Sequence, residues 1–571
     1  MRAAPRRADP ISMMKSIDEK VPLFIPLWLV WVAAFGFVLW GLGDFGLLNN
    51  NEGLYAEISR EMLASHDWRL WVIPHLNGLP YLEKPPLLYW LTALSFTLFG
   101  QSEWAARLAP ALSSLSCVAM LLWFGKTLNR PQVGRLAALM FVSGTGVIAM
   151  SHVLMFDMLL TALLTAALMF AFRYLREKKP WFLRRSYAFL ALAVLAKGFV
   201  ALILYGLIVA GMLLASERSI SGFFRACANW LAPRALLVFF IIAAPWHIVA
   251  SATEPIFSWF YFTNEHLLRF LGKREPRDYY SGNWWYYLPR MALYLFPWSF
   301  LPLGLIGARL RKLPPEPSLP RFLLIAWLAP LLFFSISSAK ANYYLVAVMP
   351  FAAFHLATAI EERGFLFAKA RLAPGVAICV LTLILLAAFA MRADDGSVLR
   401  IWGIPQRAFL QYLFGGIAVL ALAAGLCAQR IPRVGIIAYL VLPVWIAAGA
   451  MAVQHAMEPQ TSTRQLSNYL KSELPDRTVY LYRNFEELSS LPFYLKHPVP
   501  VVDTCSNDLF WGNKLRANEI VISKEQFLAA LEKNRAAIVV MQRQLGNFKA
   551  AGLAGLFKGD KRIGDTTVFF N

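Results

Sequence analysis

The chain has 571 residues, of which 58% are hydrophobic and only 16% are charged. Soluble globular domains carry roughly 45–50% apolar and about 25% charged residues. The composition therefore excludes a soluble enzyme and a disordered chain, and it indicates a polytopic membrane protein. Lys and Arg number 55 against 34 acidic residues, for a formal net charge of +21. Because membrane proteins collect Lys and Arg in cytoplasmic loops, this excess does not imply a nucleic-acid partner.

The chain begins with a polar, basic segment, Met1–Lys20, and then turns apolar. The apolar run is too long for the core of a secretory signal, so we expect no cleavable signal peptide. Five cysteines are spread along the chain without a Cys-x-x-Cys pair. Neither a disulfide framework nor a zinc-finger site is predicted from them.

Spanning helices need about 20 mostly apolar residues each. We predict thirteen spans, at residues 22–43, 105–125, 134–153, 156–175, 185–197, 199–216, 234–252, 286–308, 321–339, 342–360, 372–391, 407–427 and 434–453. With the N-terminus in the cytoplasm, every short basic loop then faces the cytoplasm, as the positive-inside rule favours. Counting Pro85–Ser102 as a further span would reverse this distribution, so we predict a re-entrant or interfacial helix there.

Two long outer loops follow from this topology, at residues 44–104 and 253–285. In the first, Gly53–Ser65 is predicted to lie along the membrane face, with an apolar side and a charged side. The second is dense in aromatic residues, Tyr279 and Tyr280 among them. It has two interpretations, an interfacial aromatic belt or a groove for a lipid chain or sugar.

The composition changes near residue 457, where charge rises and no further span is found. We predict a membrane domain at 1–456 and an outer α/β domain at 457–571. The strands and the helix expected in the second domain are Thr478–Tyr482, Val499–Asp503, Ala537–Met541, Thr567–Phe570 and Lys524–Asn534.

Ionisable side chains near membrane depth are costly and are therefore candidates for function. In this topology they gather at the outer ends of the spans. They are Glu52, Glu57, Glu83, Lys84, Asp157, Lys197, Arg269 and Lys340, with Tyr343 and Tyr344 beside the last. A proton-coupled transporter is expected to place such groups near the midplane, within repeated halves. Their one-sided distribution instead predicts a site at the outer surface.

Each group also has a purely structural interpretation. Glu52 and Asp157 lie at predicted helix starts, where acids and N-caps are favoured. Lys84 could extend to lipid headgroups, and Lys197 and Lys340 could be ordinary turn or helix-end residues. The remaining candidates are Arg269 with Lys273, Arg274 and Arg277, as a solvated charge run, and His152, Glu265 and His266, as polar groups or ligands of a divalent metal.

Two stretches of the first outer loop carry a family resemblance. Asn51–Ile58 reads NEGLYAEI and His75–Pro86 reads HLNGLPYLEKPP. They resemble the first outer loop of bacterial GT-C glycosyltransferases of the protein mannosyltransferase-like family. Leu195–Gly198 and Lys340 match later landmarks of that family. Many members have Asp where this chain has Asn51, so Glu52 is expected to carry the acidic role.

The resemblance implies a GT-C membrane fold and a sugar donor carried on polyprenyl phosphate. Glu52 and Asp157 become the expected catalytic acids. The residues implied to bind the donor phosphate are Lys84, Arg269, Lys340 and Lys197, and those lining the substrate pocket are Tyr55, Glu83, Tyr343 and Tyr344. Neither a nucleotide nor a cofactor is required; a divalent metal at His266 and Glu83 stays an open alternative.

Within the family, the chain is most similar to members that move 4-amino-4-deoxy-L-arabinose from undecaprenyl phosphate to lipid A. The implied reaction inverts the anomeric centre, at the periplasmic face of a bacterial inner membrane. The implied partners are the lipid-linked donor, lipid A and membrane lipids, without nucleic acid. Two alternatives stay open: the same chemistry on a protein or another glycan, or a transporter of a lipid-linked sugar.

Overall fold

The computed structural model describes residues 24–217, 219–277, 282–305, 319–363, 368–390, 399–431, 435–517 and 520–571. Predictions for the basic N-terminal segment and for Tyr279 and Tyr280 fall outside these residues. The same holds for five residues of the predicted basic loops, namely Arg218, Arg309, Arg311, Lys312 and Arg433.

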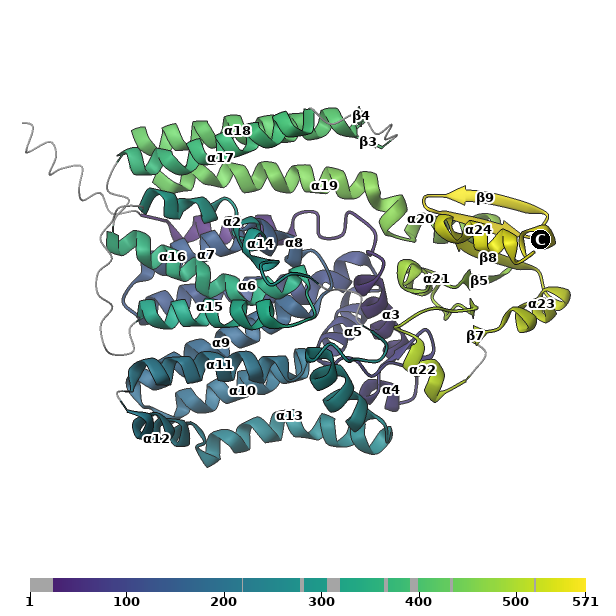
Figure 1. Cartoon of the computed structure of the whole chain (residues 1–571), viewed down its shortest axis with the longest axis horizontal. Coiled ribbons are helices and arrows are strands. Elements are labelled where there is room, and N and C mark those ends of the chain that lie inside the picture. The colour runs from purple at the N-terminus through teal and green to yellow at the C-terminus, as the bar shows by residue number, and fades with distance from the viewer. Residues whose placement is uncertain are drawn as a thin grey trace, which may run out of the picture.

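Most of the chain forms helices that run side by side along the long axis of the molecule (Figure 1). From the N-terminus to the second outer loop they are α2 (Leu27–Leu39), α3 (Asn51–Ala64), α4 (Arg69–Val72), α5 (Leu87–Phe99), α6 (Glu103–Thr127), α7 (Pro131–Val142), α8 (Thr145–Ser151), α9 (Phe156–Glu177), α10 (Pro180–Lys197), α11 (Val200–Ser216), α12 (Ile220–Trp230), α13 (Pro233–Thr253) and the π-helix η1 (Trp259–Leu268). A short hairpin, β1 (His75–Leu76) with β2 (Leu79–Pro80), lies between α4 and α5.

The second half of the helical part is also built mainly of helices. Its elements are α14 (Tyr287–Tyr294), η2 (Trp298–Leu305), α15 (Leu319–Ile336), η3 (Asn342–Val348), α16 (Met349–Arg363), α17 (Ala368–Ala390), the hairpin β3 (Arg400–Ile401) with β4 (Ile404–Pro405), α18 (Gln406–Arg430), η4 (Gly435–Leu440) and α19 (Val441–Thr461).

Among the described residues, eight helical stretches are long and apolar enough to cross a membrane, or nine if the bent pair α7 and α8 forms one span. The apolar helices α2, α5 and α11 are shorter, with 13, 13 and 17 residues. The chain is thus a multi-span helical membrane protein, while the count of thirteen crossings stays a prediction. Because α5 has the same length as α2, which is predicted to cross, length does not separate the two, and the re-entrant or interfacial assignment of Pro85–Ser102 stays a prediction.

Two predicted spans are not single straight helices. The segment at 134–153 bends by 67° between α7 and α8, at Ser143–Gly144. A Cβ at Gly144 would lie 2.9 Å from the carbonyl oxygen of Tyr294, so this break lets α14 approach closely. The predicted helix at 286–308 is wrong: α14 ends at Tyr294, and only the 3-10 segment η2 follows Pro297. Proline removes a helical N–H and disfavours helix in the residue before it.

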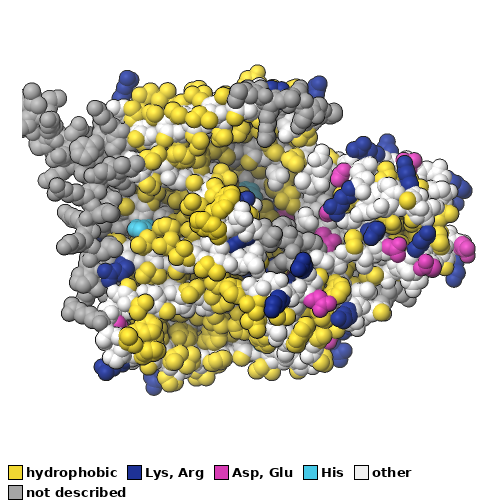
Figure 2. Space-filling view, viewed as in Figure 1, with side chains coloured by type: hydrophobic (Ala, Val, Ile, Leu, Met, Phe, Trp, Pro, Cys, Tyr) yellow, Lys and Arg dark blue, Asp and Glu magenta, His cyan; other side chains and the backbone are white. Residues whose placement is uncertain are grey.

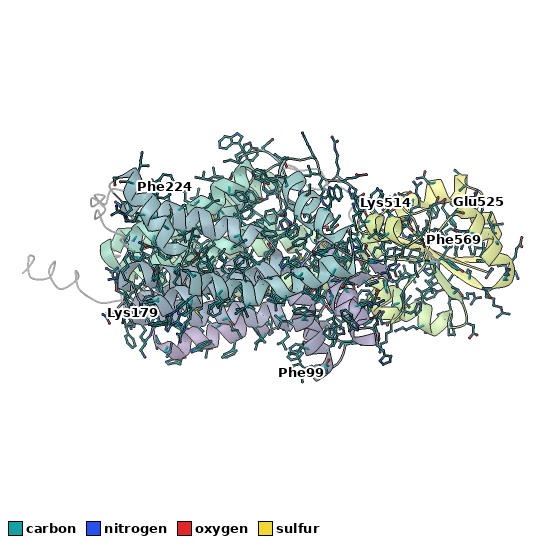
Figure 3. All side chains as sticks on the ribbon, turned by 90° about the horizontal axis from the view of Figure 1, so that it is seen from below. Phe99, Lys179, Phe224, Lys514, Glu525 and Phe569 are labelled. Carbon is teal, nitrogen blue, oxygen red and sulfur yellow. The ribbon has the colours of Figure 1, made fainter. Side chains whose placement is uncertain are left out.

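Hydrophobic side chains cover the surface of the helical part, and charged side chains gather on the part that follows α19 (Figure 2). This C-terminal domain, residues 464–571, sits at one end of the helices. Lys179 and Phe224 lie at the opposite end, as Figure 3 shows.

The C-terminal domain is built on a six-stranded mixed sheet in the order β7-β6-β5-β8-β10-β9. Strands β7, β6, β5 and β8 are parallel, whereas β10 is antiparallel to β8 and β9. Its strands are β5 (Thr478–Tyr482), β6 (Val501–Val502), β7 (Val521–Ile522), β8 (Ala536–Met541), β9 (Gly559–Ile563) and β10 (Thr566–Phe570). Its helical segments are α20 (Arg464–Glu473), η5 (Glu486–Leu488), α21 (Leu491–Leu495), α22 (Phe510–Leu515), α23 (Lys524–Lys533), η6 (Gln542–Gln544), α24 (Leu545–Ala550) and η7 (Ala554–Leu556).

The strands and the helix predicted for this region are confirmed within two residues at each end, whereas β7 and β9 were not predicted. β8 is buried at all six positions, which is why its sequence reads as a continuous apolar run. β9 carries Asp560, Lys561 and Arg562 and is mostly exposed at the sheet edge, so it lacks a clear alternating pattern.

The sequence predicts that helix α3 lies along the membrane face with a solvated polar side, but the structure buries that side. All residues from Glu52 to Met62 are buried, because the C-terminal domain covers the polar side. A Cβ at Gly53 would lie 2.5 Å from the backbone nitrogen of Ser490, so the two parts touch at this glycine. The charges are satisfied internally: Arg60 forms two 2.7 Å hydrogen bonds to Glu57 and also donates to the carbonyl of Lys496.

Candidate active site

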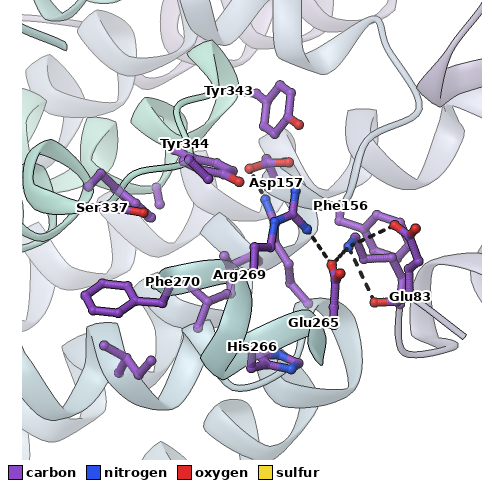
Figure 4. A pocket seen from close by; sticks show the side chains of 18 of the residues that line it. Glu83, Phe156, Asp157, Glu265, His266, Arg269, Phe270, Ser337, Tyr343 and Tyr344 are labelled. Carbon is purple, nitrogen blue, oxygen red and sulfur yellow. Dashed lines mark hydrogen bonds and ion pairs between the residues drawn. The ribbon is translucent and has the colours of Figure 1, made fainter. Parts of the chain in front are cut away.

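A cavity of about 150 Å³ opens at the end of the helical part that carries the C-terminal domain. Asp157 enters it from the first turn of α9, and Lys197 enters it from the last turn of α10. Glu265 and Arg269 come from η1 and its C-cap position. Side chains widely separated in sequence therefore meet in one cavity (Figure 4).

One side of the cavity is apolar and the other is ionic. The apolar wall is formed by Leu160, Val200, Ile203, Phe270, Phe333 and Phe334. Ile203 and Phe270 are also exposed on the outside of the helical part. The ionic wall contains Lys84, Glu83, Asp157, Lys197, Glu265 and Arg269. Such a cavity suits a ligand with an apolar chain and an anionic head.

Three cations surround one carboxylate at the centre of the ionic wall. Lys84 donates to Oε1 of Glu265 at 2.5 Å, and Arg269 donates to the same oxygen. Arg274 donates its Nε to Oε2 of Glu265 at 2.8 Å and its Nη2 to Glu83 at 2.5 Å. We call Lys84, Arg269 and Arg274 the cation cluster.

Two carboxylates, Glu265 and Glu83, hold these three cations together. Burial alone would raise the pKa of Glu265, but Arg269, Arg274 and Lys84 hold it well below its usual range. Glu265 is therefore an anion that keeps the cations in place.

Asp157 and Lys197 form a second buried ion pair on the cavity wall. The Lys197 ammonium also lies 4.8 Å from the ring centre of Tyr344 and 5.2 Å from that of Tyr343, within cation–π distance. Tyr55, on α3, lines the same cavity and packs edge-on against Phe156. The structure thus brings Asp157, Lys197, Tyr55, Tyr343 and Tyr344 together.

Glu52 lies outside the cavity. Its carboxylate accepts hydrogen bonds from the backbone nitrogens of Leu48 and Leu154 and from two nitrogens of Arg107, at 2.8–2.9 Å. Arg107 is fully buried and also donates to three backbone carbonyls. Because Leu154 is three residues before Asp157, this geometry makes Glu52 a residue that positions the start of α9.

Lys340 does not line the cavity either. Its ammonium donates to the carbonyls of Phe334, Ser335 and Ser337, at 2.6–2.9 Å. These groups lie at the C-terminus of α15, where carbonyls lack helical partners. Lys340 therefore caps this helix, which agrees with the structural interpretation of a helix-end lysine.

The residues suggested for a metal do not fit one. Nδ1 of His266 lies 2.5 Å from the carbonyl of Tyr261, and Nε2 accepts the N–H of Phe199 at 3.1 Å. Burial lowers the pKa of His266, as suits a neutral ring in these two bonds. Glu83 is occupied by Arg274 and Tyr81. Across the part of the chain that the structure describes, no group of three or more His, Cys, Asp or Glu residues could hold a metal ion.

Gly198 explains how the ring of His266 comes so close to α10. Its φ is +82°, and a Cβ there would lie 2.6 Å from Nε2 of His266. Only glycine combines this backbone conformation with this contact. The glycine of the Leu195–Gly198 motif therefore serves the packing of η1 against the end of α10.

Apart from Phe270, the described aromatic residues of the second outer loop do not line the cavity. Phe257, Phe260 and Tyr261 are buried in a cluster with Trp246 and with Trp511 of the C-terminal domain. Trp284 and Trp285 are exposed. Among the described residues of this loop, the cavity is lined instead by the three polar side chains Glu265, His266 and Arg269, together with Phe270.

The sequence does not predict two charged residues that the structure places near the site, Arg107 and Asp508. Arg107 is an arginine within the apolar segment Glu103–Thr127, and ionisable residues in such segments are functional or structural candidates by default. Asp508 comes from the C-terminal domain. Burial, followed by the neighbouring charges of Glu83 and Glu486, raises its pKa well above the usual range. No local pattern distinguishes Asp508 from a surface acid.

Comparison with known proteins finds similarity to membrane-embedded sugar transferases. The profile of the family described as dolichyl-phosphate-mannose-protein mannosyltransferase matches residues 83–249. The transferase ArnT from Cupriavidus metallidurans, crystallised with undecaprenyl phosphate, covers 95% of this chain and 97% of its own, with a TM-score of 0.77 and 24% identity. This likeness shows that the two proteins share their fold.

Two relatives carry the same name, which specifies the sugar 4-amino-4-deoxy-L-arabinose. The chain is 32% identical over 368 residues to an undecaprenyl phosphate-alpha-4-amino-4-deoxy-L-arabinose arabinosyl transferase of Aeromonas salmonicida, covering 62% of each chain. It is 33% identical over 383 residues to a protein of that name from Sodalis glossinidius, covering 63% of this chain and 65% of the relative. The alignments span a little under two thirds of these relatives' own length. The resemblance seen in the first outer loop is confirmed.

Proposed function

We propose that the chain is a glycosyltransferase that takes 4-amino-4-deoxy-L-arabinose from undecaprenyl phosphate and transfers it to a phosphate of lipid A. The observation that carries this proposal is the cavity, where an apolar wall that reaches the outside of the helical part meets Lys84 and Arg269 of the cation cluster. The names of the relatives supply the sugar and the lipid carrier. The proposed location of the reaction is the periplasmic face of the inner membrane.

The cation cluster would hold the donor phosphate. As the glycosidic bond breaks, the departing polyprenyl phosphate gains negative charge, and cations fixed in a water-poor site stabilise that charge strongly. Lys84 and Arg269 line the cavity and are already directed to one oxygen of Glu265. A phosphate oxygen entering there can take the place of that carboxylate oxygen without rearranging either cation.

Asp157 is the acid that we assign to the acceptor side. A lipid A phosphate is already ionised near neutral pH, since the second pKa of a phosphate monoester is about 6. Little deprotonation is needed, so Asp157 would orient the nucleophile or neutralise the amino group of the sugar. Lys197 holds Asp157 at the cavity wall, and Glu52 fixes the backbone before it.

The test is transfer by the purified chain in lipid nanodiscs, with the lipid-linked donor and lipid A, followed by mass spectrometry of lipid A. We expect the sugar to appear on lipid A, and Lys84→Ala to reduce the rate at least 100-fold. Lys561→Ala, which removes an exposed lysine on β9, is the matched control and should leave the rate unchanged.

Each other result points to a different function. Transfer to a protein or glycan, without transfer to lipid A, would show that the reaction is the proposed one but that the acceptor is different. Movement of the intact donor across a vesicle membrane without a covalent product would identify a transporter and overturn the proposal.

A further inference from the structure

Helix α22 of the C-terminal domain lies against two segments that carry residues of the cation cluster, Lys84 and Arg274. A Cβ at Gly512 would lie 2.7 Å from the carbonyl oxygen of Pro80, so the helix touches β2 through its backbone. The indole nitrogen of Trp511 donates to the carbonyl of Glu275 at 2.8 Å. β2 precedes Glu83 and Lys84 by a few residues, and Glu275 directly follows Arg274.

The backbone at Glu275 is held from two sides. Asn264, on η1, donates to the carbonyl of Glu275 at 2.7 Å and accepts its N–H at 3.0 Å. The Trp511 indole adds a second donor to the same carbonyl. Nearby, Asn507 donates to the carbonyl of Arg277 at 3.2 Å. Since Arg274 is the preceding residue, these bonds fix the point from which its guanidinium reaches Glu265 and Glu83.

Trp511 is placed for this role by packing. Only 7% of it is exposed, although it belongs to a short helix at the domain surface. Its ring lies 5.5 Å from that of Phe260 and 5.6 Å from that of Trp259, both on η1. The side chain therefore enters a cluster of the helical part and presents its N–H to a loop of that part.

We propose that α22 is a clamp that sets the geometry of the cation cluster, with Trp511 as a positioning residue for the donor-phosphate site. By holding β2 and the Arg274–Arg277 segment together, it keeps Arg274 within reach of both Glu83 and Glu265. The C-terminal domain would thereby determine how tightly the cavity binds a lipid phosphate. This inference rests on the proposed function.

The test measures binding of undecaprenyl phosphate alone to the full chain in nanodiscs. Trp511→Phe keeps an aromatic ring and removes the N–H, and we expect it to weaken binding about fivefold, the usual effect of one lost hydrogen bond. In turnover it should raise KM for the donor more than it lowers kcat. Trp402→Phe, at an exposed tryptophan on the β3–β4 hairpin, is the matched control and should change neither quantity.

A double-mutant cycle separates positioning from general stability. In an Arg274→Lys background, Trp511→Phe should weaken binding less than twofold, because the guanidinium that the clamp positions is gone. The same fivefold loss in both backgrounds, or no loss in either, would overturn the inference. Should Trp511→Phe fail to fold, Gly512→Ala replaces it, and it is assessed by the same criteria.

The two proposals fail differently. A wild-type chain that binds undecaprenyl phosphate, with variants that bind equally well, overturns the clamp and leaves the proposed function intact. A wild-type chain that does not bind this lipid overturns both.

Discussion

Glu52 and Arg107 form an ion pair in which both side chains are fully buried. Removing one partner of such a pair leaves an uncompensated charge and costs about 3–5 kcal/mol. We therefore expect Glu52→Gln to lower the thermal midpoint strongly, while activity per folded molecule falls much less. Thermal unfolding in detergent, with activity assayed below the midpoint, checks this.

The matched control is Glu361→Gln. Glu361 faces Arg130 at 3.5 Å, and both side chains are about two-fifths exposed, at 43% and 35%. Exposed pairs contribute about 0–1 kcal/mol, so the midpoint should hardly move. Equal shifts for the two variants, or complete inactivity of a folded Glu52→Gln protein, would contradict a positioning role.

Asp508 predicts a pH dependence of stability. Burial, Glu83 and Glu486 raise its pKa in the folded protein above the unfolded value of about 3.9. The folded state then binds the proton more tightly than the unfolded state, so stability is lost as pH rises from about 4 through the folded pKa. Asp508→Asn removes this loss and should raise the thermal midpoint more at pH 8 than at pH 4.5. A shift of the same size at both values would show that Asp508 titrates normally.

At the scale of elements, the contact of α3 with the C-terminal domain depends on Gly53. A Cβ there would come within 2.5–2.6 Å of Ser490, so Gly53→Ala should destabilise the protein by about 1–3 kcal/mol. Gly36→Ala, in helix α2, is the control, because nothing lies within 4 Å of a Cβ at that position. It should be neutral or slightly stabilising, as alanine favours helices. Thermal unfolding of both variants tests the sign, and a stabilising Gly53→Ala would contradict the contact.

Elements were predictable where the local pattern decides them. The apolar spans and the buried strand β8 follow from composition, and Asp157 and Lys197 were found because charges at span ends are costly. The sequence places Arg274 only in a solvated charge run and gives Asp508 no role, since the environment of both is made by segments far away in sequence. The roles predicted for Glu52 and Lys340 differ from their placement for a similar reason. Only the folded chain shows that Arg107 and the end of α15 engage these side chains.

At the scale of the molecule, the C-terminal domain lies at one end of the helices, and Lys179 lies at the other (Figure 3). The positive-inside rule assigns the Lys179 end to the cytoplasm. We expect an impermeant thiol reagent to label Cys505, an exposed cysteine of the C-terminal domain, in intact spheroplasts.

The matching variant is Lys179→Cys in a Cys505→Ser background. It should be labelled only after the membrane is permeabilised. Labelling of both positions from outside, or of Lys179→Cys alone, would reverse or abolish the proposed orientation.

Glu265 gives the resting cavity an anion of its own. A lipid phosphodiester bears one negative charge and must compete with this tethered carboxylate, so ground-state association is expected to be modest. When the sugar departs, the phosphate gains negative charge, which makes its exchange with the Glu265 carboxylate far more favourable. The cations then stabilise the transition state more than the bound donor, and this difference speeds the reaction. The spent carrier retains that extra charge, so we expect it to leave slowly and to act as a product inhibitor.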